Sequence, residues 1–105
     1  MNSSESRPRK TNVNVLLPGT KSATHRHTDT SEAVVSIYGS AIERFYDDEG
    51  NETEMVVMTV GSDCPGVVVE QGRYHSLEAN GEPGVIMEAK AHKYHPFKTE
   101  DILDK

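Results

Sequence analysis

Three histidines and one glutamate stand out because their side chains could share a metal ion. His25 and His27 are separated by one residue, Glu32 follows after four more positions, and His75 lies far along the chain. In a β-strand, residues i and i+2 point to the same face, so His25 and His27 can converge while Arg26 points away. Two imidazoles and one carboxylate form a facial set of ligands that leaves positions open for water or substrate. The pattern predicts a site for one divalent metal ion.

The distant histidine strengthens this prediction, because a lone His-x-His pair is more often a polar strand face than a metal site. Gly72 and Arg73 form a turn directly before His75, which begins another apolar run. The predicted metal ligands are His25, His27, Glu32 and His75. These ligand types suit zinc, iron, nickel, manganese or copper, so the metal stays open. A metal-free barrel in which the histidines only pack remains the alternative.

Short alternating or apolar runs, separated by turn residues, are the elements that must position these side chains. The runs predicted as strands are Val13–Leu17, Ser22–Thr28, Glu32–Tyr38, Ala41–Tyr46, Glu54–Val60, Val67–Glu70, His75–Glu78 and Val85–Ala91. The chain has no convincing helical period, and its connections are too short for the crossovers that parallel pairing needs. The sequence therefore predicts an all-β fold, an antiparallel jelly-roll barrel of eight short strands.

With 105 residues the chain is long enough for one core and too short for two. Residues 1–12 carry few apolar side chains and are expected to form a flexible N-terminal tail. The barrel is expected over residues 13–96, and residues 97–105 are expected to form an acidic C-terminal tail.

Charge and hydropathy exclude several classes of partner. The formal net charge is −6, and the basic residues form no stripe that could neutralise a phosphate backbone, so nucleic acid is not expected. No segment has the hydropathy of a signal peptide or a membrane span, and a cytoplasmic protein is expected. Cys64 is the single cysteine, which excludes an intramolecular disulfide.

The segment from Gly19 to Gly39 matches the first motif of the cupin superfamily, G-x5-H-x-H-x4-E-x6-G, at every specified position. The second motif, G-x5-P-x-G-x2-H-x3-N, is half present. Gly72 and His75 match it, whereas its leading Gly, its Pro and its Asn are replaced by Cys64, Glu70 and Ala79. The resemblance implies a double-stranded β-helix, which is the cupin barrel, with a metal ion at the motif's histidines and glutamate.

Within the superfamily, residues 14–96 resemble the WbuC-type cupin-fold metalloproteins, some of which belong to polysaccharide biosynthesis clusters. The matching segments are Leu17–Thr20, His25–His27, Ser31–Glu32, Phe45–Gly50, Gly72–Glu78, Met87–Lys90 and Tyr94. The resemblance implies a metal-binding cupin without a settled reaction. It also implies a homodimer, since cupins commonly dimerise by pairing edge strands.

Glu88 and Lys90 alternate on one face of the last predicted barrel strand. If that face turns inward, they bring a carboxylate and an ammonium beside the metal, where they could serve as acid and base. The leading hypothesis is a metal-dependent enzyme, of isomerase, epimerase or oxygenase type, that acts on a small polar or sugar-derived metabolite. The alternative is a binding or sensing module without turnover. His92 and His95 are expected to be exposed and outside the ligand set. Tyr94 is expected to cap the barrel, with a position over the pocket as the alternative.

Overall fold

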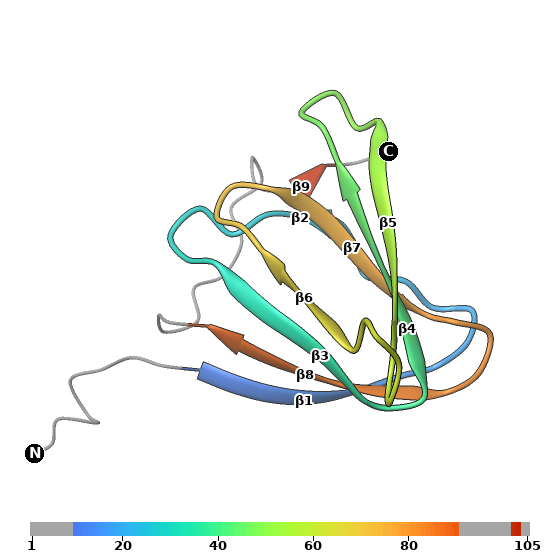
Figure 1. The fold of residues 1–105 in the computed structure, drawn as a ribbon. Coiled ribbons are helices and arrows are strands. Elements are labelled where there is room, and N and C mark those ends of the chain that lie inside the picture. The colour runs from blue at the N-terminus through green and yellow to red at the C-terminus, as the bar shows by residue number, and fades with distance from the viewer. Residues whose placement is uncertain (1–9, 91–101, 104–105) are drawn as a thin grey trace, which may run out of the picture.

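The computed structural model describes residues 10–90 and 102–103, and every regular element among them is a β-strand (Figure 1). The strands are β1 (Lys10–Leu16), β2 (Thr24–His25), β3 (Glu32–Tyr38), β4 (Ser40–Tyr46), β5 (Glu52–Thr59), β6 (Gly66–Val69), β7 (Tyr74–Ala79), β8 (Gly84–Lys90) and β9 (Ile102–Leu103). The all-β prediction is confirmed. Within the described part of the chain, no helix is present that could cross a membrane.

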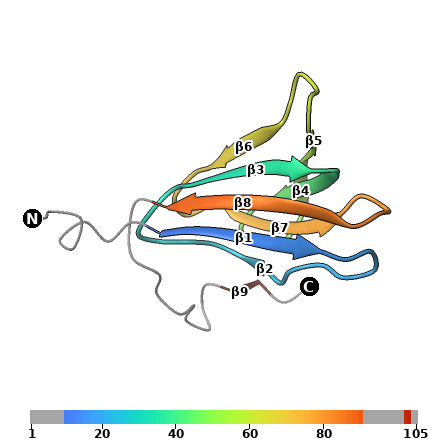
Figure 2. The ribbon, with the colours of Figure 1, turned by 90° about the horizontal axis from the view of Figure 1, so that it is seen from below.

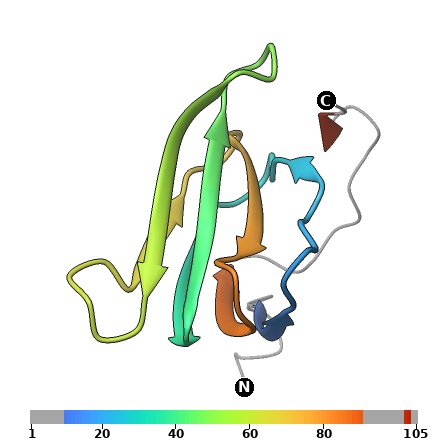
Figure 3. The same ribbon diagram turned by 90° about the vertical axis from the view of Figure 1, so that its right-hand side faces the viewer.

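The strands form two antiparallel sheets that face each other. The first is four-stranded in the order β1-β8-β3-β6 and lies in front in Figure 2. The second is five-stranded in the order β5-β4-β7-β2-β9, which Figure 3 shows side by side. Except for the β4–β5 pair, neighbouring strands are distant in sequence, and β1 pairs with β8 along its whole length. This topology is the antiparallel jelly-roll arrangement that the sequence predicts.

The core lies between the sheets and is small. Alternation of buried and half-buried positions along β4 and most of β3 sends every second side chain inward. The apolar cluster at the centre consists of Val34, Ala41, Phe45, Met58, Val69, Leu77 and Ile86. Several polar side chains share this interior at one end of the barrel, and they form the candidate site.

Most predicted strands agree with the structure to within two residues, and three differences are larger. β1 begins at Lys10, inside the predicted tail, because its first residues continue the ladder opposite the end of β8. The predicted strand over residues 22–28 is reduced to β2 and an isolated bridge between Lys21 and Glu78. β9 falls inside the predicted acidic tail, because Leu103 and Ile102 pair with the outer edge of β2.

Candidate metal centre

Strand pairing brings the histidines of the two motifs together. His25 of β2 lies directly opposite His75 of β7 in the antiparallel ladder, so their side chains share one face. The turn before His75 is tied to the first motif by Gly72, whose N–H donates to the carbonyl of His27 at 2.7 Å. Gly72 has a positive φ of 84°, a conformation that glycine adopts without strain. Arg26 points away as predicted and lies over the ring of Tyr74.

The three imidazoles form one cluster between the sheets. One nitrogen from each of His25, His27 and His75 lies within 4.8 Å of the others. The ring centroids are 4.4 Å apart for His25 and His75, 5.3 Å for His25 and His27, and 5.6 Å for His27 and His75. Three imidazoles at such separations are close enough to hold a metal ion.

Glu32, at the start of β3, faces this cluster from the opposite sheet. Its Oε1 lies 3.6 Å from Nε2 of His27 and 3.9 Å from Nε2 of His75. Its side chain is 1% exposed, and neither carboxylate oxygen is hydrogen-bonded to a described residue. Burial alone would raise the pKa of Glu32, but the interaction with His27 and the charge of Lys90 hold it below its ordinary value. The structure thus places an ionised, buried carboxylate beside the imidazoles.

Burial keeps two of the imidazoles neutral, which is the form that binds metal. The pKa of His25 is lowered to about 4 by burial and by the neighbouring His75. Burial also lowers the pKa of His75 to about 4, although the negative charge of Glu32 opposes this. The Nδ1 atom of His25 donates to the carbonyl oxygen of Ala23 at 2.7 Å, which leaves Nε2 as the atom available to a metal.

Glu43 is a site residue that the sequence reasoning missed. This side chain of β4 is completely buried, and its Oε2 lies 2.6 Å from Nδ1 of His75. Burial and the negative charge of Glu32 raise the pKa of Glu43 to about 8. A signal was available, because Ala41, Glu43 and Phe45 alternate on one face and the two apolar residues belong to the core. A carboxylate between two core positions indicates a functional or paired group.

Glu88 and Lys90 of β8 both face the interior, which is the orientation that the sequence left open. Lys90 lies opposite Glu32 in the β3–β8 ladder, and its Nζ is 3.7 Å from Oε2 of Glu32. Burial and the negative charge of Glu32 raise the pKa of Glu88 to about 7. Asn14 of β1 donates its Nδ2 to Oε1 of Glu88 at 2.9 Å. The structure therefore brings both residues to the candidate site, while their catalytic role stays a prediction.

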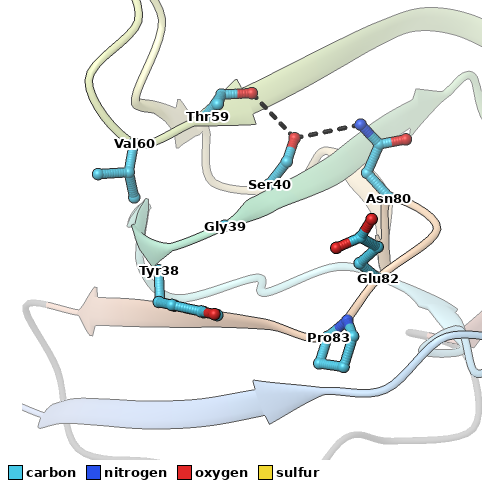
Figure 4. A pocket seen from close by; sticks show the side chains of 8 residues that line it. All are labelled: Tyr38, Gly39, Ser40, Thr59, Val60, Asn80, Glu82 and Pro83. Carbon is cyan, nitrogen blue, oxygen red and sulfur yellow. Dashed lines mark hydrogen bonds between the residues drawn. The ribbon is translucent and has the colours of Figure 1, made fainter.

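A cavity of about 350 Å³ reaches this region from the side of the barrel. It opens between β1 and the segment that precedes β2, and its wall includes Glu88, Leu77 and Ile86. A second, larger cavity of about 550 Å³ lies at the other end of β3, around the β3–β4 and β7–β8 turns (Figure 4). There Ser40 forms hydrogen bonds with Thr59 and Asn80. No described histidine lines either cavity, and the smaller one meets the candidate site through Glu88.

The predictions for His92, Tyr94 and His95 fall on residues outside the described part of the chain.

Several solved structures share the fold at low sequence identity. The capsular polysaccharide assembling protein CapF from Staphylococcus aureus matches 92% of this chain and 28% of its own, with 22% identity and a TM-score of 0.67. Oxalate decarboxylase from Bacillus subtilis matches 90% of this chain and 24% of its own, with 22% identity and a TM-score of 0.72. The chain thus spans about a quarter of the length of these two proteins.

A cupin-2 domain containing protein from Shewanella frigidimarina matches 80% of this chain and 71% of its own, with 19% identity and a TM-score of 0.63. The chain has the cupin fold. No family model and no curated protein matches its sequence, so a membership in the WbuC-type cupins stays a prediction.

The interior of this cupin-fold chain fits a metal ion by its own chemistry. Both carboxylate oxygens of Glu32 and the Nε2 atom of His75 are buried, and none of them has a hydrogen-bond partner among the described residues. Buried polar atoms in this state are costly, and a cation would satisfy them together. The donor set of neutral imidazoles and an ionised carboxylate is the set that zinc, iron and manganese accept.

Proposed function

We propose that this cupin binds one divalent metal ion through His25, His27 and His75, with Glu32 as the fourth ligand. The observation that carries the proposal is the buried cluster of three imidazoles with a carboxylate 3.6 Å and 3.9 Å from two of their nitrogens. Manganese is one candidate, since the oxalate decarboxylase of similar fold is described with Mn(II) centres. Zinc, iron, nickel and copper remain candidates on ligand type.

We further propose that the protein is a metal-dependent enzyme for a small polar metabolite. When bound, the metal would act as a Lewis acid on an oxygen of the substrate. Glu88 would exchange a proton with the substrate, and Lys90 would hold the carboxylate of Glu32 in place through its ion pair. The inward placement of Glu88, on the wall of a cavity with room for a small molecule, supports an enzyme over a binding module.

The placement of an acid–base group favours proton transfer, as in an isomerase or epimerase, over an oxygenase. A sugar-derived substrate is suggested by the resemblance to WbuC-type cupins and by the fold shared with a capsular polysaccharide assembling protein. A homodimer is the expected assembly.

The metal proposal is tested by elemental analysis of the purified protein and by titration of the metal-free protein with Mn²⁺, Zn²⁺ and Fe²⁺. We expect one ion per chain. A chain without bound metal that also takes up none of these ions would contradict the proposal.

The catalytic proposal is tested by incubating the metal-loaded protein with sugar-derived and hydroxy-acid metabolites in D₂O. Proton transfer at carbon would incorporate deuterium, which NMR detects. Glu88→Gln should abolish this exchange and retain the metal, because Glu88 is not among the proposed ligands. Binding of a metabolite without deuterium incorporation would indicate a binding or sensing module instead, and oxygen consumption would indicate an oxygenase.

A further inference from the structure

The larger cavity lies at the end of the barrel away from the histidines. Its volume is about 550 Å³, which is within the range of small-molecule sites. Glu32 begins β3 beside the imidazoles, whereas Tyr38 ends the same strand at this cavity. Six steps of about 3.3 Å separate the two residues, so the cavity is about 20 Å from the candidate metal centre. It is therefore a separate place where the chain can hold a small molecule.

Backbone contacts between neighbouring turns hold the walls of this cavity together. Gly39, in the β3–β4 turn, has a positive φ of 72°, and a Cβ atom there would lie 3.1 Å from the carbonyl oxygen of Pro83 in the β7–β8 turn. The carbonyl of Gly39 also accepts from the N–H of Val60 at 3.2 Å. The carbonyl of Ser40 accepts from the N–H of Asn80 at 3.4 Å. Walls that are already fixed lower the entropy cost of binding a ligand.

Three bonded polar side chains cross one wall of the cavity (Figure 4). The Oγ atom of Ser40 lies 2.9 Å from Oγ1 of Thr59 and accepts from Nδ2 of Asn80 at 3.2 Å. One hydroxyl hydrogen joins Ser40 to Thr59, so the other hydroxyl hydrogen of this pair is left to donate to a ligand. The Oδ1 atom of Asn80 has no hydrogen-bond partner among the described residues and can accept.

Tyr38 and Glu82 line the opening from the two turns, and Figure 4 shows both side chains directed into the same space. Neither side chain has a hydrogen bond or ion pair with another described residue. Tyr38 is 65% exposed because the register of β3 against β8 shifts after the buried Ser36 and brings Tyr38 opposite Val85. Regular alternation would turn this ring toward the core, so the bulge is what directs it to the cavity.

The free groups of this wall match a ligand that carries hydroxyl groups. Glu82 and Asn80 offer acceptors, whereas the pair of Ser40 and Thr59 and the hydroxyl of Tyr38 offer donors. An ammonium ion can only donate, so it would leave these donors unmatched. Among the described residues no Lys, Arg or His lines the cavity, and the carboxylate of Glu82 would repel an anion.

We propose that this cavity binds a neutral sugar ring. The aromatic ring of Tyr38 stacks on the C–H face of the sugar, and Pro83 supplies further apolar surface. The sugar hydroxyls, each of which donates and accepts, bond to Glu82, to Asn80 and to the free hydroxyl hydrogen of the Ser40 pair. The site is one for binding, because hydrolysis of a glycosidic bond normally uses two carboxyl groups and Glu82 supplies the one carboxyl group of the described wall.

The proposal does not depend on the metal, because none of the proposed metal ligands lines this cavity. Binding should be weak, since the site is open and each hydrogen bond to the sugar replaces one to water. A dissociation constant on the order of 1 mM is expected.

A titration of the full, ¹⁵N-labelled chain followed by NMR tests the proposal. The probes are the methyl glycosides of glucose, galactose, mannose and N-acetylglucosamine, with spermidine and glucose 6-phosphate as charged comparisons. At least one glycoside should give saturable shifts of the amide signals of Gly39, Thr59 and Asn80, while those of His25 and His75 stay in place. The proposal would be overturned if no glycoside saturates, if the shifts centre on the histidines, or if a charged probe binds more tightly than every glycoside.

Two substitutions at the opening measure which side chains hold the sugar. Tyr38→Ala should weaken binding more than about fivefold, because it removes the stacking surface. Glu82→Ala should weaken it about threefold or more, because it removes two acceptors. Val68→Ala and Glu49→Ala are the matched controls, since both residues are exposed and neither lines the cavity. Both controls should bind as the wild type does, and equal losses in a control and its counterpart would contradict the assignment.

Metal content and circular dichroism on the same samples keep this inference distinct from the metal proposal. If Tyr38→Ala fails to fold, Glu82→Ala carries the test, because Glu82 is exposed in a turn. Both variants should retain the metal content of the wild type. Conversely, His75→Ala should lose metal and still bind the glycoside, and a folded His75→Ala chain that binds no glycoside would place the sugar at the metal centre instead.

Discussion

Arg44, on the outer face of the five-stranded sheet, donates to Glu78 at 2.8 Å and to Glu52 at 3.1 Å. The outer face of the four-stranded sheet presents Val13 and Val15 instead, with no charged side chain among its described outward-facing residues. The first face is typical of a sheet in water, and the second is typical of a buried one. The two sheets enclose one core, yet among the described residues the ion pairs of an outer face lie on the five-stranded sheet, beside the exposed Met55 and Val57.

The inner faces differ in a complementary way. The five-stranded sheet supplies His25 and His75, whereas the four-stranded sheet supplies Glu32, Glu88 and Lys90. The candidate site is therefore assembled across the gap between the sheets, with neutral nitrogen donors on one side and charged groups on the other. Two packed sheets can hold such groups at fixed separation, which is what a metal site requires.

The largest expected effect comes from removing a donor on the imidazole side. His75→Ala should lower the metal affinity by more than about 100-fold. Loss of a residue that only orients a ligand costs about 10–100-fold, and loss of the ligand itself should cost more. Metal titration, and elemental analysis after dialysis, would measure this affinity. Glu32→Gln, on the carboxylate side, keeps the shape and removes the charge, and should cost at least about tenfold.

These two variants separate the contributions of the sheets. Wild-type affinity in Glu32→Gln would mean that the imidazoles of the five-stranded sheet hold the ion without the carboxylate. Full metal content in His75→Ala would mean that the cluster is not a metal site. His95→Ala is the control that the sequence suggests, and it should retain the metal.

Glu43 offers a second test within the five-stranded sheet. Its carboxylate lies 2.6 Å from Nδ1 of His75, so it fixes the ring and leaves Nε2 directed toward the cluster. Glu43→Gln should lower metal affinity about 10–100-fold while the chain stays folded. Glu43→Asp keeps the carboxyl group but shortens the side chain, and its metal affinity should lie between those of Glu43→Gln and the wild type. An unchanged affinity in Glu43→Gln would show that His75 is oriented by packing alone.

The fold and most of the candidate site could be predicted because they depend on short-range patterns in the sequence. Alternation of apolar residues marks β3 and β4, and the strand period places His25 and His27 on one face. β2 was predicted too long, because alternating polar residues satisfy the same pattern without forming a ladder. β9 was missed, because it has only two residues and its partner strand β2 lies far away in the sequence.

The parts of the site that escaped prediction depend on long-range register. Glu43 contacts His75 only because β4 and β7 pair with Phe45 opposite His75. The inverted polarity of the four-stranded sheet likewise follows from the pairing of β1 with β8 and of β8 with β3, which no local pattern specifies. The position of Glu88 and Lys90 was left open by the sequence for the same reason.

The pH dependence of the metal-free protein sharpens the contrast between buried acids and buried imidazoles. Glu43, with its folded pKa raised to about 8, stabilises the fold only while protonated, so its contribution is lost as pH rises from about 4.5 to about 8. His25 and His75 act in the opposite sense, because their folded pKa values of about 4 lie below the ordinary 6.5. They cost stability only as pH falls below 6.5.

Above pH 6.5 the contribution of the two imidazoles to stability is therefore constant. The change of stability with pH then comes from the buried acids. Between pH 7 and 8 Glu43 should dominate, and the free energy of unfolding should fall by up to about 1.4 kcal/mol per pH unit as its proton is released. Below pH 7 Glu88, with its pKa raised to about 7, adds to this slope. Urea unfolding of the chelated protein at several pH values measures the slope. Glu43→Gln should flatten it between pH 7 and 8, and an unchanged slope in that range would locate the titrating group elsewhere. In the loaded protein, acid should release the metal nearer to pH 4 than to pH 6.5, because these imidazoles stay neutral until then.

The smallest effect is expected on the solvated face. The side chain of Arg44 is 26% exposed, and its partners Glu52 and Glu78 are 41% and 26% exposed, so water and salt screen both ion pairs. Arg44→Ala should reduce the free energy of unfolding by about 1 kcal/mol or less, and less still at high salt. Urea unfolding at low and at high salt measures both effects. A loss well above 1 kcal/mol that high salt leaves unchanged would show that water does not screen these ion pairs, and the contrast between the two outer faces would then need another cause.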